Sequence, residues 1–120
     1  MLYTIEATKK TPSISFKEKE IFISGSSVEE SPVEFYEELN THFEVALKGG
    51  FTPDRIIVRL DYINTSSLKR FITFIKKVLV HCPNASIVWH YANDDEDMME
   101  IGKLLAQMLD ISITFESFDA

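Results

Sequence analysis

Hydrophobic and polar positions alternate near the start of the chain, as they do in β-strands. Residues 13–16 alternate and are followed by the charged run Lys17-Glu18-Lys19-Glu20 and then by the β-rich run 21–24. Two such runs around a short polar connection predict an antiparallel hairpin. The small polar residues Gly25-Ser26-Ser27 then predict a loop.

Three later segments have apolar residues every three or four positions, which predicts three amphipathic helices. The first is expected to start with Ser31 as its cap and Pro32 in the first helical position, and to stop at Gly49-Gly50. The second covers 66–81 and the third follows 93–95. The expected core-facing residues are Phe35, Leu39, Phe43 and Ala46 in the first helix, Leu68, Phe71, Ile72, Ile75, Val78 and Leu79 in the second, and Met98, Ile101, Leu105 and Met108 in the third.

Strands are predicted between and after these helices, at 55–60, 85–91 and 111–115. The order β-β-α-β-α-β-α-β predicts an α/β fold with a mostly parallel sheet, right-handed crossovers and an antiparallel hairpin at its start. A chain of 120 residues fits one such domain, residues 1–120. Functional groups in these sheets gather at the carboxyl ends of strands, which points to the loops after Leu60 and Tyr91.

Composition narrows the class of partner. The formal net charge is −7, and an acidic domain repels the phosphates of nucleic acids and of anionic membranes, so a protein partner is expected. The single cysteine, Cys82, excludes a disulfide within the chain. The start of the chain lacks a signal-peptide pattern, and no apolar run approaches the roughly 18 residues of a membrane span. These features predict a cytoplasmic protein without membrane insertion.

The run from Asp61 to Ser67 has the most informative chemistry. It lies between a predicted strand and a predicted helix and offers three hydroxyls and an amide where backbone N–H groups lack partners. Asn, Thr and Ser are preferred there as helix caps, which is one interpretation. The other is a phosphoacceptor, because a helix N-terminus stabilises added negative charge.

The acidic run Asp94-Asp95-Glu96-Asp97 has two interpretations as well. It could supply oxygen ligands to a divalent metal, although it has no glycine for the bend of a cation-binding loop. It could equally complement the dipole of the helix that it opens. His42, His81 and His90 lie on separate predicted elements and form no pair with ligand spacing. No general base adjoins the serines and threonine of 64–67, so a hydroxyl nucleophile is not expected.

Four segments of the chain resemble the SiaC family of bacterial regulatory phosphoproteins. They are spread in order along nearly the whole chain, and the third and fourth are specific to the family. The segments are Thr11-Pro12-Ser13-Ile14, Gly25-Ser26-Ser27-Val28-Glu29-Glu30, Tyr62-Ile63-Asn64-Thr65-Ser66-Ser67-Leu68-Lys69, and Val88-Trp89-His90-Tyr91 with Asp94-Asp95-Glu96-Asp97-Met98.

The resemblance implies a fold similar to STAS domains, the anti-sigma-factor-antagonist type, and a phosphorylated threonine at Thr65. It also implies a dedicated Ser/Thr kinase, a PP2C-type phosphatase and, in the best-known case, a diguanylate cyclase bound by the unmodified form, in c-di-GMP signalling that regulates biofilms. The second segment departs from the family pattern, because Ser26, Val28 and Glu29 stand where an acid, an aromatic residue and proline are usual.

The leading hypothesis is a signalling protein with no active site and no cofactor, which switches partners through reversible phosphorylation of Thr65. Its expected contact residues are Asp61, Tyr62, Asn64, Ser66 and Ser67. The competing hypothesis is a metal-dependent enzyme that uses the cluster Asp94–Asp97.

Overall fold

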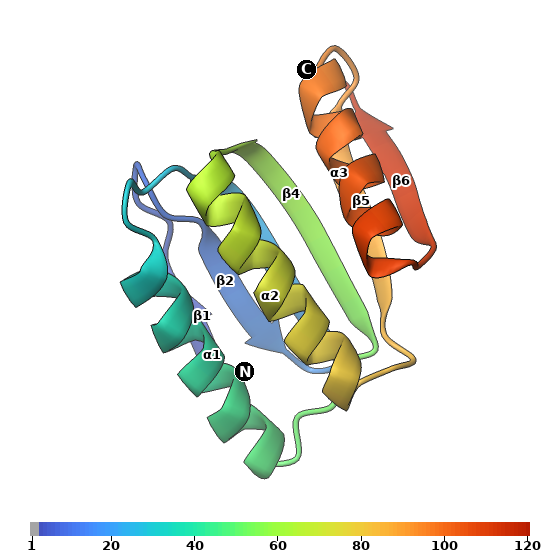
Figure 1. Ribbon diagram of the computed structural model, residues 1–120. Helices are drawn as coiled ribbons and strands as arrows, with labels where there is room; N and C mark the ends of the chain where they lie inside the picture. Colours follow the sequence, from blue (N-terminus) through green and yellow to red (C-terminus); the bar gives the residue numbers. More distant parts are fainter. Residues whose placement is uncertain (1–2) are drawn as a thin grey trace.

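A six-stranded sheet covered by three helices makes up the computed structural model, which describes residues 3–120 (Figure 1). The elements are β1 (Tyr3–Ile5), β2 (Ser13–Lys17), β3 (Glu20–Ser27), α1 (Val33–Lys48), β4 (Arg55–Ile63), α2 (Thr65–His81), β5 (Ser86–Ala92), α3 (Glu96–Leu109) and β6 (Ile113–Phe118).

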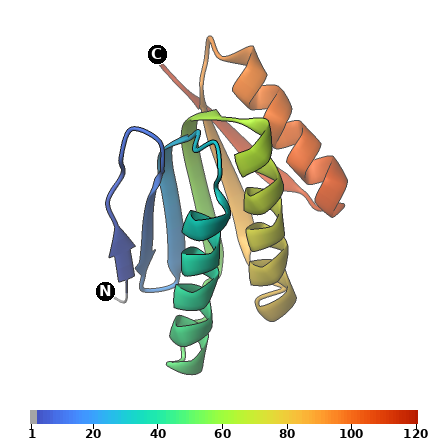
Figure 2. The same ribbon diagram turned by 60° about the vertical axis from the view of Figure 1, so that its left-hand side comes forward.

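The strands lie in the sheet in the same order as in the chain. β1, β2 and β3 pair antiparallel, and β3 to β6 pair parallel. Right-handed crossovers that always step to the next strand in one direction put every helix on the same face. Figure 2 shows α1, α2 and α3 on one side of the sheet. The predicted α/β fold, with a mostly parallel sheet and an N-terminal antiparallel hairpin, is confirmed.

Two features of the N-terminal half differ from the sequence prediction. β1 was not predicted, because a strand of three residues is too short to show alternation. Gly25-Ser26-Ser27 is not a loop but the end of β3, with a register shift against β4 between Gly25 and Ser26. Gly25 has φ +103°, a conformation that glycine adopts without strain, so the glycine marks an irregular strand here.

The start of α1 and the end of β4 also differ from the prediction. Pro32, not Ser31, occupies the capping position of α1, and no side chain caps that helix. β4 continues past Leu60 to Ile63, with Leu60 paired to Gly25 and Tyr62 to Ser26. The residue left over in this register makes a bulge at Asp61. As a result Leu60 and Ile63 are both buried, whereas Asp61 and Tyr62 are exposed.

The core lies between the helices and the covered face of the sheet, and aromatic rings fill much of it. The largest fully buried side chains include Phe16, Phe43, Phe71, Phe74 and Trp89. Phe43 meets both Phe16 and Phe74 edge-on, with ring centroids 6.1 and 5.8 Å apart, a favourable arrangement for aromatic pairs. These contacts fix α1 and α2 on the sheet.

Helix α3 packs closely because Gly102 has no side chain. A Cβ at this position would lie 2.7 Å from atoms of Trp89 and of Phe115. The indole Nε1–H of Trp89 donates to the carbonyl of Met98 at 3.0 Å. The buried row of α3 therefore runs through Met98, Gly102 and Leu105, and the prediction that Met108 belongs to it was wrong. Met108 is 56% exposed because it lies beside this row.

Gly102→Ala is expected to destabilise the fold by about 1–3 kcal/mol, because the added methyl overpacks the contact with Trp89 and Phe115. In an exposed helix interior, replacing glycine with alanine would instead raise the unfolding free energy by up to about 1 kcal/mol. The sign of the change therefore shows whether Gly102 is packed against other side chains. Urea unfolding measures it, with Lys103→Ala on the exposed side of α3 as the control. A neutral or stabilised Gly102→Ala variant would contradict this packing.

Candidate functional site

The four family-like segments all reach the end of the molecule where the parallel strands end, and the fourth lies apart from the other three, because β4 and β5 pair only from Arg55 to Val58. The β1–β2 loop lies against the chain after β3, since Val28 N–H donates to the Lys10 carbonyl at 2.8 Å. The backbone N–H of Asn64 donates to the Ser27 carbonyl at 3.0 Å. In Figure 2 the loops before α1, α2 and α3 all lie at the upper end of the sheet. The segments after Leu60 and after Tyr91, to which the sequence pointed, therefore share one end of the fold (Figure 2), although β4 continues to Ile63 before α2 begins.

Asn64 joins the end of β4 to α2 and to the segment before α1. Its side-chain Oδ1 accepts from the Ser67 N–H at 2.9 Å, which caps α2. Its Nδ2 donates to the Glu29 carbonyl at 3.1 Å. Its backbone N–H also donates to the Ser27 carbonyl, so Asn64 links the end of β3, the start of α2 and the segment before α1.

Thr65 is the first residue of α2, and its side chain is exposed. Within residues 3–120, no described group forms a hydrogen bond with its hydroxyl. The capping interpretation holds for Asn64, which supplies the cap of α2, and the Thr65 hydroxyl is not the cap. Ser66 is exposed beside it. The arrangement offers a free hydroxyl on a rigid backbone, at the positive end of a helix dipole.

The predicted contact residues divide into two groups. Asp61, Tyr62 and Ser66 are exposed, and Tyr62 is 60% accessible. Ser67 is fully buried, and its Oγ has no hydrogen-bond partner among the described residues. Asn64 is half-buried and engaged in the bonds above. Asp61, Tyr62 and Ser66 are thus at the surface, whereas Ser67 is not accessible to a partner and Asn64 is only partly so.

A hollow of about 310 Å³ lies between the start of α2 and the segment before α1, and we call it the Thr65 hollow. Its lining residues are Glu30, Ser31, Pro32, Val33, Thr65, Ser66, Lys69 and Arg70. Lys69 and Arg70 were not predicted as site residues, although Lys69 ends the third family-like segment. Their spacing of four and five residues from Thr65 was the available signal, because residues four apart share a helix face.

A buried pair of hydroxyls supports the hollow from below. Ser27 Oγ and Tyr36 Oη lie 2.7 Å apart and connect the end of β3 to α1. Burial raises the pKa of Tyr36 to about 12, so the phenol keeps its proton and the pair stays neutral. This pair holds α1 close to the strand end from which the Asn64 junction is built.

Asp95, in the acidic cluster of the competing hypothesis, has a structural role. Asp95 Oδ1 accepts from the Met98 N–H at 3.0 Å and caps α3, and Glu96 and Asp97 lie in its first turn. In the part of the chain that the structure describes, no three His, Cys, Asp or Glu side chains are grouped to hold a metal ion. Burial raises the pKa of the Cys82 thiol, which disfavours the reactive thiolate.

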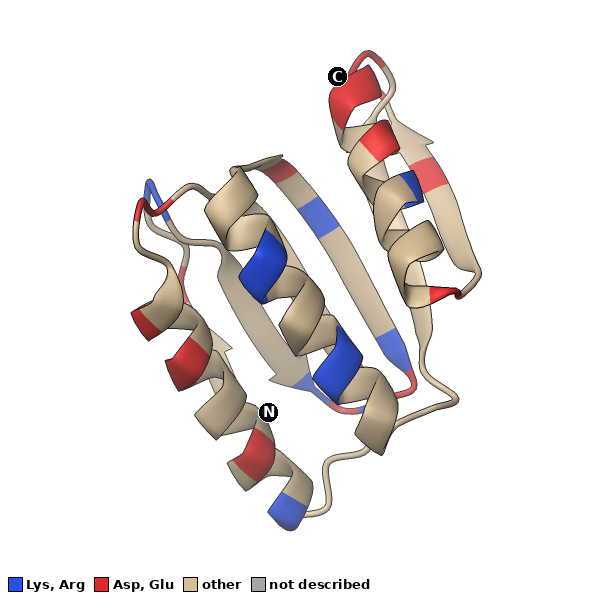
Figure 3. Cartoon of the chain, in the orientation of Figure 1, with Lys and Arg blue, Asp and Glu red and all other residues tan. Residues whose placement is uncertain are grey.

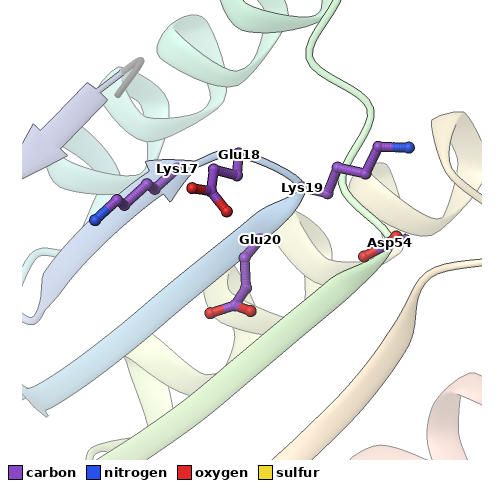
Figure 4. Close-up of a pocket in the computed structure, with 5 residues that line it drawn as sticks. All are labelled: Lys17, Glu18, Lys19, Glu20 and Asp54. Carbon is purple, nitrogen blue, oxygen red and sulfur yellow. The ribbon is translucent and has the colours of Figure 1, made fainter.

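Another hollow, of about 400 Å³, lies at the opposite end of the sheet (Figure 4). It is formed by the β2–β3 turn and the start of β4, and its lining residues are Lys17, Glu18, Lys19, Glu20 and Asp54. The Glu20 carboxylate faces Arg55, with 3.6 Å between Oε2 and Nη1. None of the family-like segments reaches this end, so it is not the candidate site.

A family model described as "SiaC family regulatory phosphoprotein" matches residues 5–118. The chain belongs to the SiaC family. The fold of this family member is also found in solved structures. SiaC of Pseudomonas aeruginosa is 24% identical with a TM-score of 0.74, and the match covers 97% of this chain and 98% of that one. No curated protein matches this chain.

The second solved structure is described as diguanylate cyclase SiaD in complex with its activator SiaC, from the same organism. The matched chain of that structure is 24% identical to this chain, with a TM-score of 0.75, and the match covers 98% of this chain and 99% of that one. The apo-SiaC crystal structure is 22% identical over 98% of both chains, with a TM-score of 0.66. Across residues 3–120, no helix is long and apolar enough to cross a membrane.

Asn64→Ala is expected to cost about 1–2 kcal/mol of unfolding free energy because it removes the cap of α2. Thr65→Ala is expected to change stability by less than about 0.5 kcal/mol, since its exposed hydroxyl has no structural partner. Urea unfolding of both variants tests this. Asn64→Asp is the control, because it keeps the capping oxygen and loses only the bond to the Glu29 carbonyl. Equal losses in the Asn64→Ala and Thr65→Ala variants would contradict this assignment of the cap.

Proposed function

We propose that this SiaC-family protein is a signalling protein without catalysis of its own, switched by reversible phosphorylation of Thr65. In the unmodified state it binds a protein partner through the surface of Asp61, Tyr62 and Ser66 around Thr65. Phosphorylation places a phosphate of roughly −1.5 to −2 charges on that surface and releases the partner. Asn64 and Ser67 hold the surface in shape from beneath.

One observation carries the proposal: the Thr65 hydroxyl is exposed and free while Asn64 caps the helix. A kinase can modify such a hydroxyl without unfolding α2, and a phosphatase can reach the product. The modified residue keeps its place in the first turn, where the helix dipole stabilises negative charge. The modification therefore changes the surface charge at little cost to the fold.

The loss of partner affinity expected on phosphorylation of Thr65 is large enough for a switch. The exposed carboxylate of Asp61 already makes this surface acidic on the β4 side, and the phosphate adds to it. A partner surface that is acidic or apolar at this point loses affinity through repulsion and desolvation. A change of about 3 kcal/mol lowers affinity more than 100-fold.

The expected partners follow from family membership. They are a Ser/Thr kinase, a PP2C-type phosphatase and a diguanylate cyclase, the last because SiaC of P. aeruginosa is described as the activator of SiaD. Three residues differ from the usual family pattern: Ser26 near the end of β3, and Val28 and Glu29 in the segment after it. The Glu29 carbonyl accepts a hydrogen bond from the Asn64 side chain. These residues border the site, so they are placed to select the partner. A cytoplasmic location and the absence of a cofactor fit this role.

Phosphopeptide mapping after treatment with the kinase of the native host is the first test. Thr65 is expected to be the principal phosphorylated residue. Modification mainly at Ser66 or Thr73, which are also exposed on α2, would contradict the proposal. Ser67 is the internal control, because its fully buried hydroxyl should remain unmodified in the folded protein.

Substitutions at Thr65 are expected to separate binding from stability. Thr65→Ala should bind the partner like the parent, and Thr65→Asp should bind at least about tenfold more weakly through added charge. Thr65→Asp should be no less stable than Thr65→Ala, because an acid in the first helical turn is favourable. Partner titration and thermal melts of both variants measure this, with Thr65→Ser as the phosphorylatable control. Equal binding by Thr65→Asp and the parent would overturn the switch.

A further inference from the structure

Basic charge in this acidic protein is concentrated on α2. The helix has four basic residues, Lys69, Arg70, Lys76 and Lys77, and no acidic one. Its neighbours are acidic, with four glutamates in α1 and Glu96, Asp97 and Glu100 in α3. Figure 3 shows the blue bands of α2 between the red bands of the two other helices.

Interactions within the fold do not account for this charge. Lys77 pairs with Glu44 of α1, but Lys69, Arg70 and Lys76 form no ion pair with any described residue. Three exposed cations are thus available to a negatively charged partner.

Helical geometry aligns two of these cations with Thr65. At 100° per residue, Thr65, Lys69, Lys76 and Val80 lie within about 60° of one another around the α2 axis. All four are exposed, and we call them the α2 stripe. The stripe is about 22 Å long, since it covers fifteen steps of 1.5 Å. A facing helix has the same rise per residue and can match its spacing.

The far end of the stripe is apolar. Val80 is 76% exposed and Met108 of α3 is 56% exposed. They border a hollow of about 320 Å³ between the C-terminal ends of α2 and α3, and we call it the α2–α3 hollow. Its lining residues are Lys76, Leu79, Val80, Met108, Leu109 and Ile111. Exposed apolar side chains gathered around a hollow are typical of a binding surface.

We propose that the α2 stripe and the α2–α3 hollow bind an acidic amphipathic helix of a partner protein. Carboxylates of that helix pair with Lys69 and Lys76, and an apolar residue at one end enters the hollow beside Val80 and Met108. This is the helix-in-groove mode of recognition, with charge complementarity fixing the orientation. The inference rests on the proposed function, because the stripe begins at Thr65.

The stripe also connects the phosphate to the docking surface. A phosphate on Thr65 lies one turn from Lys69, on the same side of α2. It neutralises that lysine and repels the carboxylates of the bound helix. Phosphorylation therefore removes one attractive contact and adds a repulsive one at the same end of the stripe.

Selection from a random peptide library tests the docking surface directly, and the partner itself is not needed. Peptides of about 18 residues, long enough to cover the stripe as a helix, are displayed on yeast and selected with the unmodified full chain. Enriched peptides are expected to have an excess of Asp and Glu over the unselected library, and Leu, Ile, Phe or Met near one end. Enrichment of basic or uncharged peptides, or no enrichment, would overturn the proposal.

Variants then locate the binding of the enriched peptides. Lys69→Glu with Lys76→Glu, and separately Val80→Asp with Met108→Asp, should each weaken peptide binding at least about tenfold. The matched control, Lys9→Glu with Lys19→Glu, makes the same change in net charge away from α2 and should leave binding unchanged. Circular dichroism melts confirm that each variant folds. Equal losses in the control and the stripe variants would contradict the assignment.

One further measurement keeps a second copy of the chain apart from a partner helix. Sedimentation of the chain alone reports self-association, and a dimer dispersed by Lys69→Glu with Lys76→Glu would show that a second copy covers the stripe instead. The peptide selection uses unmodified protein and so does not depend on phosphorylation. Peptide binding to the unmodified chain that is unchanged once Thr65 is phosphorylated would refute only the switch, whereas phosphorylation of Thr65 by the native kinase without any peptide binding would refute only the docking surface.

Discussion

Three hydrogen bonds made by Asn64 hold the candidate site together. The backbone N–H reaches the end of β3, the side-chain oxygen caps α2, and the side-chain amide reaches the Glu29 carbonyl before α1. Because the Asn64 side chain caps α2, the hydroxyl of the next residue is not needed for the cap. The free hydroxyl of Thr65, and with it the proposed switch, depends on this division of roles between two adjacent residues.

The strand order gives α2 its central position. Sequential parallel strands place all three helices on one face, so α2 lies between α1 and α3 (Figure 1). One side of α2 packs on the sheet, and Lys77 pairs with Glu44 of α1. The outer side, from Thr65 to Val80, remains free. The proposed phosphorylation site and docking stripe are thus parts of one rigid helix, so charge at one end acts directly on binding along it.

Periodicity in the sequence predicted the helices, most strands and the sheet type, because these depend on which positions are buried. It missed β1 and the extension of β3, since three residues show no pattern and Gly25 resembles a turn residue. The sequence located Thr65 but not the cap, because asparagine, threonine and serine all cap helices and the backbone decides among them. Burial of Ser67 was predictable, since it lies four residues before Phe71 on the same helix face.

The central claim is that phosphorylation at Thr65 changes a surface and leaves the fold intact. Amide hydrogen exchange, compared between the unmodified and the Thr65-phosphorylated chain, tests it most directly. We expect equal protection along α2, including the Ser67 amide that donates to Asn64, with differences confined to the residues around the Thr65 hollow. Loss of protection at Ser67 and through the first turns of α2 would show that the phosphate unfolds the helix start, and would contradict the account.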